Sequence, residues 1–594
     1  MRRFRGVFVV AGLLCAVSLA GCGLPWPFPQ PTPDPRLPDA QQVFRPLESG
    51  PNAGDVDTFD PAQIQFGFDY GVAQLIFPQL VTLDEKQQPM DWAAESHTIS
   101  ADGLTYTFHL HKGMAWADGT PIDATIFAYS INRTLDPCTA TYTATHLFDL
   151  AGAEAFNNGA CPAGAIKSAA TLIGTAIQTP DPLTLRLTLA HPAGYFLSAL
   201  TYPTSWAVPQ ALVEKYTTPV HYSSNDSNGT DSTWTEHLLD NGPFGGNLYL
   251  LTTWQHPNST ADGRGHLVFE RNERFSGKKP LLRRIEYTLY RAADLRTEWQ
   301  DFTRGAGDSA SIYSDALTIA QARTLAGVVL QQVPSLGFSF LAINWKYAPF
   351  DDVRVRQAFS LALDRQAIEH EMFLDTSQPT IHLAPEGMPG YNPDLTDAAG
   401  RKGKDALTPD IPAAQALLKS YAADKCRGQL VLCPPIYLSV PNGSTRFLQL
   451  GKMLQQQWQQ AFPGWSISLQ TLGGDIELSR PRHLQLWWDG WGADYPDPHD
   501  FLSVLWATQA EYNYSAVSMP QVDALLSQAD GMSDQAARIS LYQLAEQLLV
   551  NQGAAIPLTQ NVYWYAVRSR VVGWQVAPTD VTPLSVWQTA YLKR

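Results

Sequence analysis

The chain of 594 residues is too long for a single hydrophobic core, so two or three domains are expected. Hydrophobic residues make up 45% and charged residues 16%, an ordinary globular composition that excludes a disordered or membrane-embedded protein. The formal net charge of −15 and the pI of about 5.3 argue against nucleic acid or anionic lipid as a partner, because the average surface would repel both.

The first residues have the pattern of an export signal. Three arginines within the first five residues precede an apolar stretch, residues 6–19, that is too short to span a bilayer as a permanent helix. The segment Leu19-Ala20-Gly21-Cys22 then resembles a bacterial lipobox, in which cleavage before the cysteine leaves it as the lipidated N-terminus. Residues 1–21 are therefore predicted to be a lipoprotein signal peptide, and Cys22 to anchor the mature protein to the outer face of the bacterial cell membrane.

A proline-rich segment follows the predicted cleavage site. Seven prolines lie between positions 25 and 38, and such a stretch favours extended polyproline geometry. Residues 22–40 are therefore predicted to be a semi-rigid tether that lifts the folded body off the lipid surface, although a docking peptide for an SH3-type domain is the alternative. The folded body is expected to begin near Gln41.

Four cysteines remain once the signal is removed and Cys22 carries lipid. Of the three possible connectivities, the simplest is local and pairs Cys138 with Cys161 and Cys426 with Cys433. An oxidising compartment outside the cytoplasm would allow both disulfides to form. The cysteine spacings match no zinc pattern, so neither a metal nor a cofactor is expected.

Alternation of hydrophobic and polar residues predicts two half-buried strands. Residues 104–110 and 183–189 both alternate with a period of two, which is typical of a strand with one buried face. His109 falls on the polar face of the first strand, and His111 follows it. Two histidines could bind a metal, but no third ligand is near them in the sequence, so an exposed strand face is expected.

The second half of the chain alternates between strands and helices. Residues 338–343 are an apolar strand, and the next helix has apolar residues at i, i+3 and i+4 from Val355, with Asp351 or Asp352 placed to cap it. Strand, helix and strand follow again over residues 430–472. This order predicts βα units, and therefore an α/β fold with a largely parallel sheet.

Residues 486–502 combine three tryptophans, two closely spaced glycines and Asp494 at the end of a predicted strand, where α/β sheets place their ligands. The missing Cβ of glycine lets a bound molecule approach and hydrogen-bond to the main chain, and Asp494 would supply a charge. Alternatively, the tryptophans are core residues and Asp494 caps the turn before Pro496. The candidate ligand-binding residues of this segment are Trp488, Gly490, Trp491, Gly492 and Asp494.

The run Gly490–Pro498 resembles the GWxADYxxP segment of the family 5 extracellular solute-binding proteins, the peptide- and nickel-binding components of ABC importers. Residues 106–137 and 349–368 resemble two further signatures of the same family. Residues 58–68 resemble the family's early loop, which lines one side of the ligand cleft. The residues of this loop that the resemblance assigns to the cleft are Gln65, Phe66 and Gly67.

The resemblance implies a fold and a domain organisation. The fold would be α/β and periplasmic-binding-protein-like, of type II, in the large three-domain class with an interdomain ligand cleft. Domain II is expected at residues 79–191 and domain III, which carries Asp494, at residues 308–561. The ligand would bind between domains I and III, which close on it by a hinge. Domain I would be discontinuous and comprise residues 41–78, 192–307 and 562–594.

The resemblance also implies a function. Asp494 matches the aspartate that pairs with the α-ammonium of the peptide in the family's oligopeptide and dipeptide binders. An extended peptide could also pair its main chain with the backbone of Gly490 and Gly492. The implied protein is a monomeric substrate-binding lipoprotein that delivers peptides to ABC permease subunits, without a cofactor and without a nucleic-acid partner.

Two alternatives remain open. The oligopeptide binders carry an arginine where this chain has Trp488, so the ligand could be an oligosaccharide stacked on aromatic faces, a nickel chelate or another small solute. The second alternative is a surface-anchored hydrolase, because Asp489, Asp494 and Asp497 could supply paired carboxylates for glycoside hydrolysis. The sequence contains no Gly-x-Ser-x-Gly elbow, no His-Glu-x-x-His motif and no phosphate loop, so an enzyme is not expected.

Overall fold

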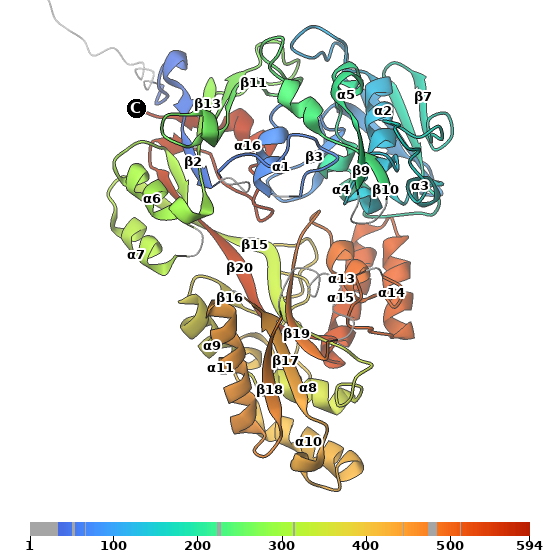
Figure 1. The fold of residues 1–594 in the computed structure, drawn as a ribbon, viewed down its shortest axis with the longest axis vertical. Coiled ribbons are helices and arrows are strands. Elements are labelled where there is room, and N and C mark those ends of the chain that lie inside the picture. Colours follow the sequence, from blue (N-terminus) through green and yellow to red (C-terminus); the bar gives the residue numbers. More distant parts are fainter. Residues whose placement is uncertain are drawn as a thin grey trace, which may run out of the picture.

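The structure is a computed structural model in which two lobes, one above the other in Figure 1, are joined by long strands. The two ends of the described chain meet in the upper lobe, where the amide of Leu37 donates to the carbonyl of Leu592 at 2.8 Å. Within the described ranges, no helix is long and apolar enough to cross a membrane. The predicted signal peptide, Cys22, most of the tether and Phe66 lie outside these ranges. The structure describes residues 34–49, 54–65, 67–222, 227–312, 315–442, 445–472, 484–510 and 512–594.

Twelve of the described strands form one sheet that runs through both lobes. Its order is β11-β12-β13-β2-β14-β20-β15-β19-β17-β18, with β1 beside β13 and β16 beside β20. The strands of the upper lobe are β1 (Val43–Phe44), β2 (Pro46–Ser49), β11 (Tyr249–Gln255), β12 (Gly265–Arg271), β13 (Arg284–Tyr290) and β14 (Ser309–Ser311). Those that join the lobes or lie in the lower lobe are β15 (Val328–Ile343), β16 (Gln378–Pro379), β17 (Ile436–Pro441), β18 (Ile467–Leu472), β19 (Leu486–Gly492) and β20 (Ala555–Arg568).

The long strands β15 and β20 connect the lobes and pair with each other in antiparallel fashion along almost their full lengths. In the upper lobe, β20 pairs with β14 through residues 565–567. In the lower lobe, β15 pairs with β19 through residues 337–343. The β15–β20 register shifts between Pro334 and Phe338, between these two sets of pairings. Because proline has no N–H to donate, the ladder is interrupted here, which makes this segment the expected hinge.

The large sheet is mixed, whereas the sequence predicted a largely parallel one. β17 pairs in parallel with β18 and β19, as expected for βα units. In contrast, β15 pairs in antiparallel fashion with both β19 and β20. The difference arises because the chain enters the lower lobe in β15 and returns to the upper lobe in β20, so these strands run in opposite directions.

The lower lobe has a hydrophobic cluster on each face of β15. Alternate residues of its apolar run, among them Phe340 and Leu341, enter opposite clusters because side chains alternate across a strand. The helix α8 begins at Val353 and is capped by Asp352, whose side chain accepts from the amide of Arg354; of the two predicted caps, Asp351 and Asp352, the second is therefore confirmed. The first cluster is covered by α8 (Val353–Leu361), α9 (Arg365–Ile368), α10 (Ile411–Lys425) and α11 (Thr445–Ala461). The second is covered by α13 (Pro498–Trp506), α14 (Pro520–Asp530) and α15 (Gln535–Asn551).

A four-stranded antiparallel sheet, β5-β6-β8-β7, lies at the side of the upper lobe (Figure 1). Both predicted half-buried strands are confirmed as β6 and β8, and His109 is exposed on β6. No group of three His, Cys, Asp or Glu residues in the described part of the chain could hold a metal ion. The strands are β5 (Ala94–Ile99), β6 (Thr105–Leu110), β7 (Ile177–Asp181) and β8 (Thr184–Thr188), packed against α2 (Ala124–Leu135).

The two predicted local disulfides, Cys138–Cys161 and Cys426–Cys433, are present in the structure.

Shorter helices and strand pairs complete the upper lobe. The helices are α1 (Gly67–Ala73), α3 (Ala153–Asn157), α4 (Phe196–Ala199), α5 (Gln210–Tyr216), α6 (Leu295–Thr303), α7 (Ala316–Thr324) and α16 (Leu584–Thr589). The strand pairs are β3 (Val81–Leu83) with β4 (Pro89–Asp91), β9 (Pro219–Tyr222) with β10 (Ser227–Thr230), and β21 (Val571–Val572) with β22 (Tyr591–Leu592).

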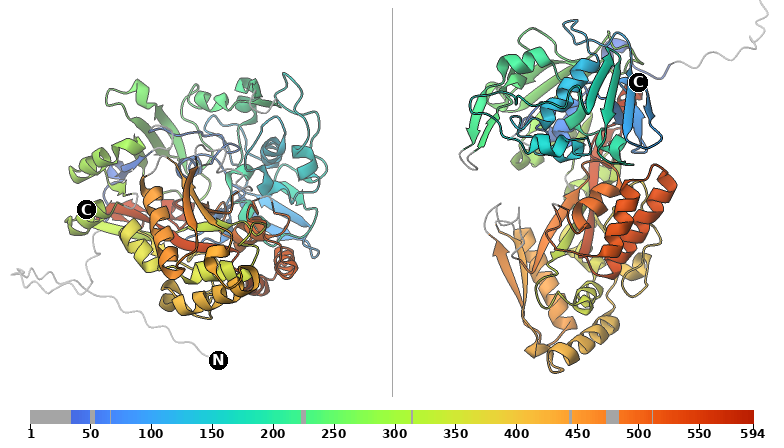
Figure 2. Two further views of the ribbon diagram at one scale, coloured as in Figure 1. Left: turned by 60° about the horizontal axis from the view of Figure 1, so that its bottom comes forward. Right: turned by 90° about the vertical axis from the view of Figure 1, so that its right-hand side faces the viewer.

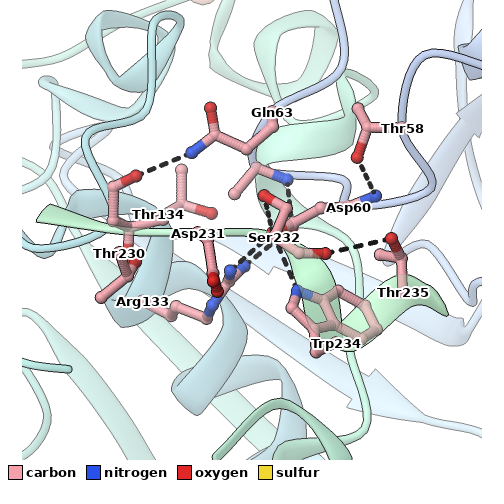
Figure 3. Close-up of polar contacts among 12 residues, drawn as sticks. Thr58, Asp60, Gln63, Arg133, Thr134, Thr230, Asp231, Ser232, Trp234 and Thr235 are labelled. Carbon is pink, nitrogen blue, oxygen red and sulfur yellow. Dashed lines mark hydrogen bonds and ion pairs between the residues drawn. The ribbon is translucent and has the colours of Figure 1, made fainter. Parts of the chain in front are cut away.

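A buried ion pair fixes the early loop of the upper lobe (Figure 3). The Arg133 guanidinium on α2 donates two hydrogen bonds to the Asp60 carboxylate, at 2.8 and 2.6 Å. The indole of Trp234 donates to the same carboxylate at 2.9 Å. Burial alone would raise the pKa of Asp60, but the charge and hydrogen bonds of Arg133 outweigh it and hold the pKa below its ordinary value. The clamp therefore holds in place the loop that continues to Gln65.

The substitution Asp60→Ala is expected to destabilise the protein strongly, because it leaves the Arg133 charge buried without a partner. The free energy of unfolding, measured by urea denaturation, should fall by about 3–5 kcal/mol. The double variant Asp60→Ala/Arg133→Met removes both charges and should recover part of this loss. A loss of less than about 1 kcal/mol for Asp60→Ala would show that the pair is not a structural clamp.

Candidate functional site

A cavity of about 410 Å³ lies between the lobes, next to Asp494. The upper lobe contributes lining residues from positions 143–195, and the lower lobe contributes lining residues from positions 494–530. Figure 2 (right) shows the helices of this part of the lower lobe lying beneath the upper lobe. We call this space the Asp494 cavity. A molecule bound here would contact both lobes at once.

Asp494 follows the end of β19, and its carboxylate faces the upper lobe. The Oδ2 atom lies 3.1 Å from Nε2 of His146, which belongs to the short 3-10 helix Ala144–Leu147 of the upper lobe. The Asp494 side chain is 31% exposed, whereas that of His146 is 9% exposed. The Asp494 carboxylate therefore reaches across the cavity to His146 rather than capping the turn before Pro496.

Asp500 positions the segment that carries Asp494. One of its carboxylate oxygens accepts from the backbone amide of Asp494 at 3.1 Å and from the indole of Trp491 at 3.2 Å. Burial, together with the nearby charge of Asp494, raises the pKa of Asp500 well above its ordinary value. Asp500 is therefore a buried internal acceptor that fixes the backbone of Asp494 and the ring of Trp491.

The two remaining acids of the segment are also used internally. Asp497 accepts from the amide of His499 at the start of α13 and forms a buried ion pair with Arg538 of α15. Asp489 accepts from the indole of Trp487 at 3.2 Å and from the amide of Gly490 at 2.8 Å. Asp494 is therefore the acid of this segment whose carboxylate is left to face the cavity.

Aromatic stacking closes one side of the Asp494 cavity. The ring of Tyr195 in the upper lobe stacks on His499 of α13 with centroids 3.5 Å apart, and the hydroxyl of Tyr195 donates to Asp149 at 2.9 Å. Burial lowers the pKa of His499 well below its ordinary value, so this imidazole is neutral at pH 7.

No lysine or arginine is among the described residues that line the cavity. The carboxylic acids that line it are Asp149, Glu154, Asp494, Asp500 and Asp530.

A second inter-lobe contact is formed by backbone at Gly194. Its amide donates to the carbonyl of Asp530 at 2.7 Å, and its carbonyl accepts from the side chain of Gln535 at 3.2 Å. A Cβ at this position would overlap the carbonyl oxygen of Met532. Only glycine allows the upper lobe to approach the turn between α14 and α15 this closely.

The tryptophans of β19 pack into the lower lobe as the strand alternation requires. Trp487 is buried and Trp491 partly buried in the cluster covered by α13–α15, whereas Trp488 lies on the other face and contacts Phe447 with ring centroids 4.4 Å apart. None of the three lines the Asp494 cavity. A Cβ added to Gly492 would meet no atom within 4 Å, so this end of the strand borders open space.

The residues predicted from the early loop lie elsewhere along the cleft. Gln65 is exposed, Phe66 lies outside the described residues, and Gly67 lines a different inter-lobe cavity, described below. The structure therefore does not bring Gly67 and Asp494 into one cavity. Sequence reasoning missed His146, Tyr195 and Gly194, since none of them belongs to a recognisable motif and only the fold brings them to the lower lobe.

Two lobes joined by a pair of long strands, with an acidic cavity between them, form the architecture of an extracytoplasmic solute-binding protein. The family model described as "Bacterial extracellular solute-binding proteins, family 5 Middle" matches residues 88–513. The chain belongs to this family, and the type II periplasmic-binding fold that its sequence implied is confirmed.

Relatives and solved structures agree with this assignment. The chain is 28% identical to the "Probable deoxycholate-binding periplasmic protein YgiS" of Escherichia coli over 92% of each chain. It is 26% identical to the periplasmic oligopeptide-binding protein OppA of Escherichia coli over 90% of each chain. It shares its fold with the unliganded open form of the murein tripeptide-binding protein MppA, with a TM-score of 0.73, 21% identity and coverage of 93% of this chain and 98% of that one.

The substitution Gly194→Ala is expected to separate the upper lobe from the α14–α15 turn, because the added methyl group would overlap the Met532 carbonyl. The radius of gyration measured by small-angle X-ray scattering should increase. Gly531→Ala is the matched control, since a Cβ there meets the nearest atoms of the same interface at 3.7 Å, an ordinary contact distance. An unchanged radius for Gly194→Ala, or an equal increase for both variants, would contradict this role of Gly194.

Proposed function

We propose that the protein is the substrate-binding lipoprotein of an ABC importer and that it captures peptides in the cleft between its lobes. The observation that carries this proposal is the position of Asp494, whose half-buried carboxylate faces an acidic cavity from the end of β19. In this proposal Asp494 accepts the α-ammonium of the peptide. The peptide stays intact, and the protein acts as a receptor rather than as an enzyme.

The electrostatics of the Asp494 cavity favour a cationic group. Its lining includes several carboxyls and no lysine or arginine among the described residues, and His499 is neutral. An ammonium group has three donors. It could therefore bind the Asp494 carboxylate while His146 keeps its contact with Oδ2. Charge-assisted hydrogen bonds in such a partly enclosed site are stronger than those on the open surface.

The edge of β19 supports main-chain recognition of a peptide. One edge pairs with β15 along residues 486–492, but the other pairs with β17 only at Leu486 and Trp487. Among the described residues, the rest of this second edge has no strand partner. An extended peptide could add there as a strand, with affinity from main-chain hydrogen bonds and little dependence on side chains. Gly490 and Gly492 would leave room for that approach.

The predicted export signal supports placing this receptor outside the cytoplasm. Cleavage before Cys22 and lipidation of its thiol would tether the folded body through the proline-rich segment to the outer face of the cell membrane. The relatives named above are described as periplasmic, and one of them as oligopeptide-binding. In this setting a single copy of the protein would deliver its peptide to the ABC permease subunits.

The structure gives less support to the other ligands considered. A sugar would need exposed aromatic rings to stack on. Here Trp487 is buried, and the indole N–H of Trp491 donates to Asp500, so these two tryptophans offer little surface for stacking. The relative described as deoxycholate-binding raises the possibility of a steroid carboxylate. Such an anion would be repelled by the Asp494 carboxylate. A ligand with a free ammonium group therefore fits best.

The substitution Asp494→Asn is expected to weaken binding of peptides with a free N-terminus roughly tenfold to a hundredfold, because it removes a charge-assisted hydrogen bond. Binding of the same peptides with an acetylated N-terminus should be affected much less. Isothermal titration calorimetry measures both. Asp351→Asn, an exposed change of the same charge on the lower lobe, is the control and should alter neither affinity. Equal losses for free and acetylated peptides would remove Asp494 from this role.

A further inference from the structure

A second cavity, of about 320 Å³, lies between the lobes and shares no lining residue with the Asp494 cavity. The upper lobe contributes most of the wall, and the lower lobe contributes Phe373, Ser377 and Arg446. We call this space the aromatic cavity. Among the aromatic side chains that line it are Phe68, Tyr287, Tyr563, Trp574 and Trp587.

Two carboxyls line the aromatic cavity. Glu48, on β2, is almost fully buried. Asp580 is half-buried, and its Oδ2 lies within 3.9 Å of the position that a Cβ on Gly67 would occupy. A third acid, Glu298 of α6, lies behind the wall, where the hydroxyls of Ser49 and Ser311 donate to it. The acids come from three distant segments of the chain, which meet only in the folded protein.

Two buried hydrogen-bond donors belong to the residues that line this wall. The indole N–H groups of Trp574 and Trp587 are buried and have no hydrogen-bond partner among the described residues. Arg446 is the one cationic residue among those that line the cavity, and it is exposed on the opposite lobe, with its guanidinium 4.6 Å from the ring centroid of Phe373. The two acids that line the cavity have partners, since the hydroxyl of Tyr565 donates to Asp580 at 2.9 Å and Ser311 hydrogen-bonds to Glu48. Buried donors without partners destabilise a protein, so the two indoles indicate that a bound molecule completes this cavity.

We propose that the aromatic cavity is a second ligand subsite, which takes a basic side chain, lysine or arginine, of the bound peptide. Glu48 and Asp580 would accept hydrogen bonds from the cation, and the aromatic walls would cover its aliphatic stem and offer cation–π contacts. The unpartnered indoles could donate to carbonyl groups of the same ligand. This subsite rests on the proposed function, since it assigns a side chain to a peptide that Asp494 holds by its N-terminus.

The protonation of the wall is consistent with this assignment. Burial raises the pKa of Asp580 to about 7 and that of Glu298 to about 8, and burial with the charges of these two acids raises the pKa of Glu48 well above its ordinary value. The other titratable groups facing them are Arg446 and the tyrosines Tyr287, Tyr563 and Tyr565. Burial raises the pKa of Tyr287 and of Tyr563, so these two hydroxyls stay neutral. A bound cation would stabilise the ionised carboxylates and displace their protons.

Calorimetric titration with matched peptides tests the subsite. In alanine tri- and tetrapeptides with a free N-terminus, each position is replaced in turn by lysine or by norleucine, which has a similar aliphatic chain without the charge. At one position the lysine peptide is expected to bind roughly tenfold or more tightly than the norleucine peptide. The preference should increase between about pH 6 and about pH 8, because the carboxyls ionise over this range.

Three variants identify the acids. Glu48→Gln and Asp580→Asn are each expected to reduce the lysine preference and to leave the affinity for the norleucine peptide unchanged. Neither should lower the melting temperature, since the uncharged form of each acid is favoured in the empty cavity. Glu95→Gln, an exposed change of the same charge on β5, is the control and should keep the full preference.

The outcomes separate this subsite from the proposed function. Equal binding of lysine and norleucine peptides at every position, or a preference that survives in both cavity variants, would overturn the subsite while leaving peptide capture intact. A complete lack of binding by any of these peptides would overturn the proposed function as well.

Discussion

The pairing of β15 with β20 is the constraint on which the rest of the structure depends. These two strands carry the chain into the lower lobe and back. In the upper lobe β20 pairs with β14, in the lower lobe β15 pairs with β19, and the pairing of β15 with β20 joins the two parts of the sheet. Their ladder is interrupted between Pro334 and Phe338, so rotation at this point changes the distance between the lobes without unfolding either. Bending of this segment would therefore change the size of both inter-lobe cavities.

Across from these strands, the lobes meet through contacts that can be broken. His146 reaches Asp494, Tyr195 stacks on His499, and the backbone of Gly194 meets the turn between α14 and α15. Tyr495 also packs into the hydrophobic cluster of the upper lobe. Because most of the other contacts are polar or aromatic, they are weaker than the packing within each lobe. A ligand that binds to groups of both lobes can replace or reinforce them, which couples ligand binding to the inter-lobe geometry.

Much of the fold was predictable, because it depends on local patterns. The strands β6 and β8 follow from alternation, the cap of α8 from Asp352, and the position of Asp494 from a glycine-rich segment at a strand end. The site as a whole was not predictable. No sequence pattern places His146 beside Asp494, or Glu48 beside Asp580, because these residues are hundreds of positions apart and have no motif of their own. The prediction of a largely parallel sheet was wrong, because alternating strands and helices do not reveal that β15 and β20 cross between the lobes. The domain boundaries, the lipid anchor at Cys22 and the ligand contacts stay predictions.

The acids of this protein also show how location decides the role of a carboxyl group. Asp60 and Asp497 are paired with buried arginines and hold segments together, whereas Asp489 and Asp500 accept internal hydrogen bonds. Asp494 has the same side chain but faces a cavity. A crystal structure of the protein with the ligand that co-purifies with it tests this account most directly. The account predicts an extended molecule along β19 with an ammonium nitrogen within hydrogen-bonding distance of Asp494. A ligand outside the cleft, or an Asp494 carboxylate turned away from it, would contradict it.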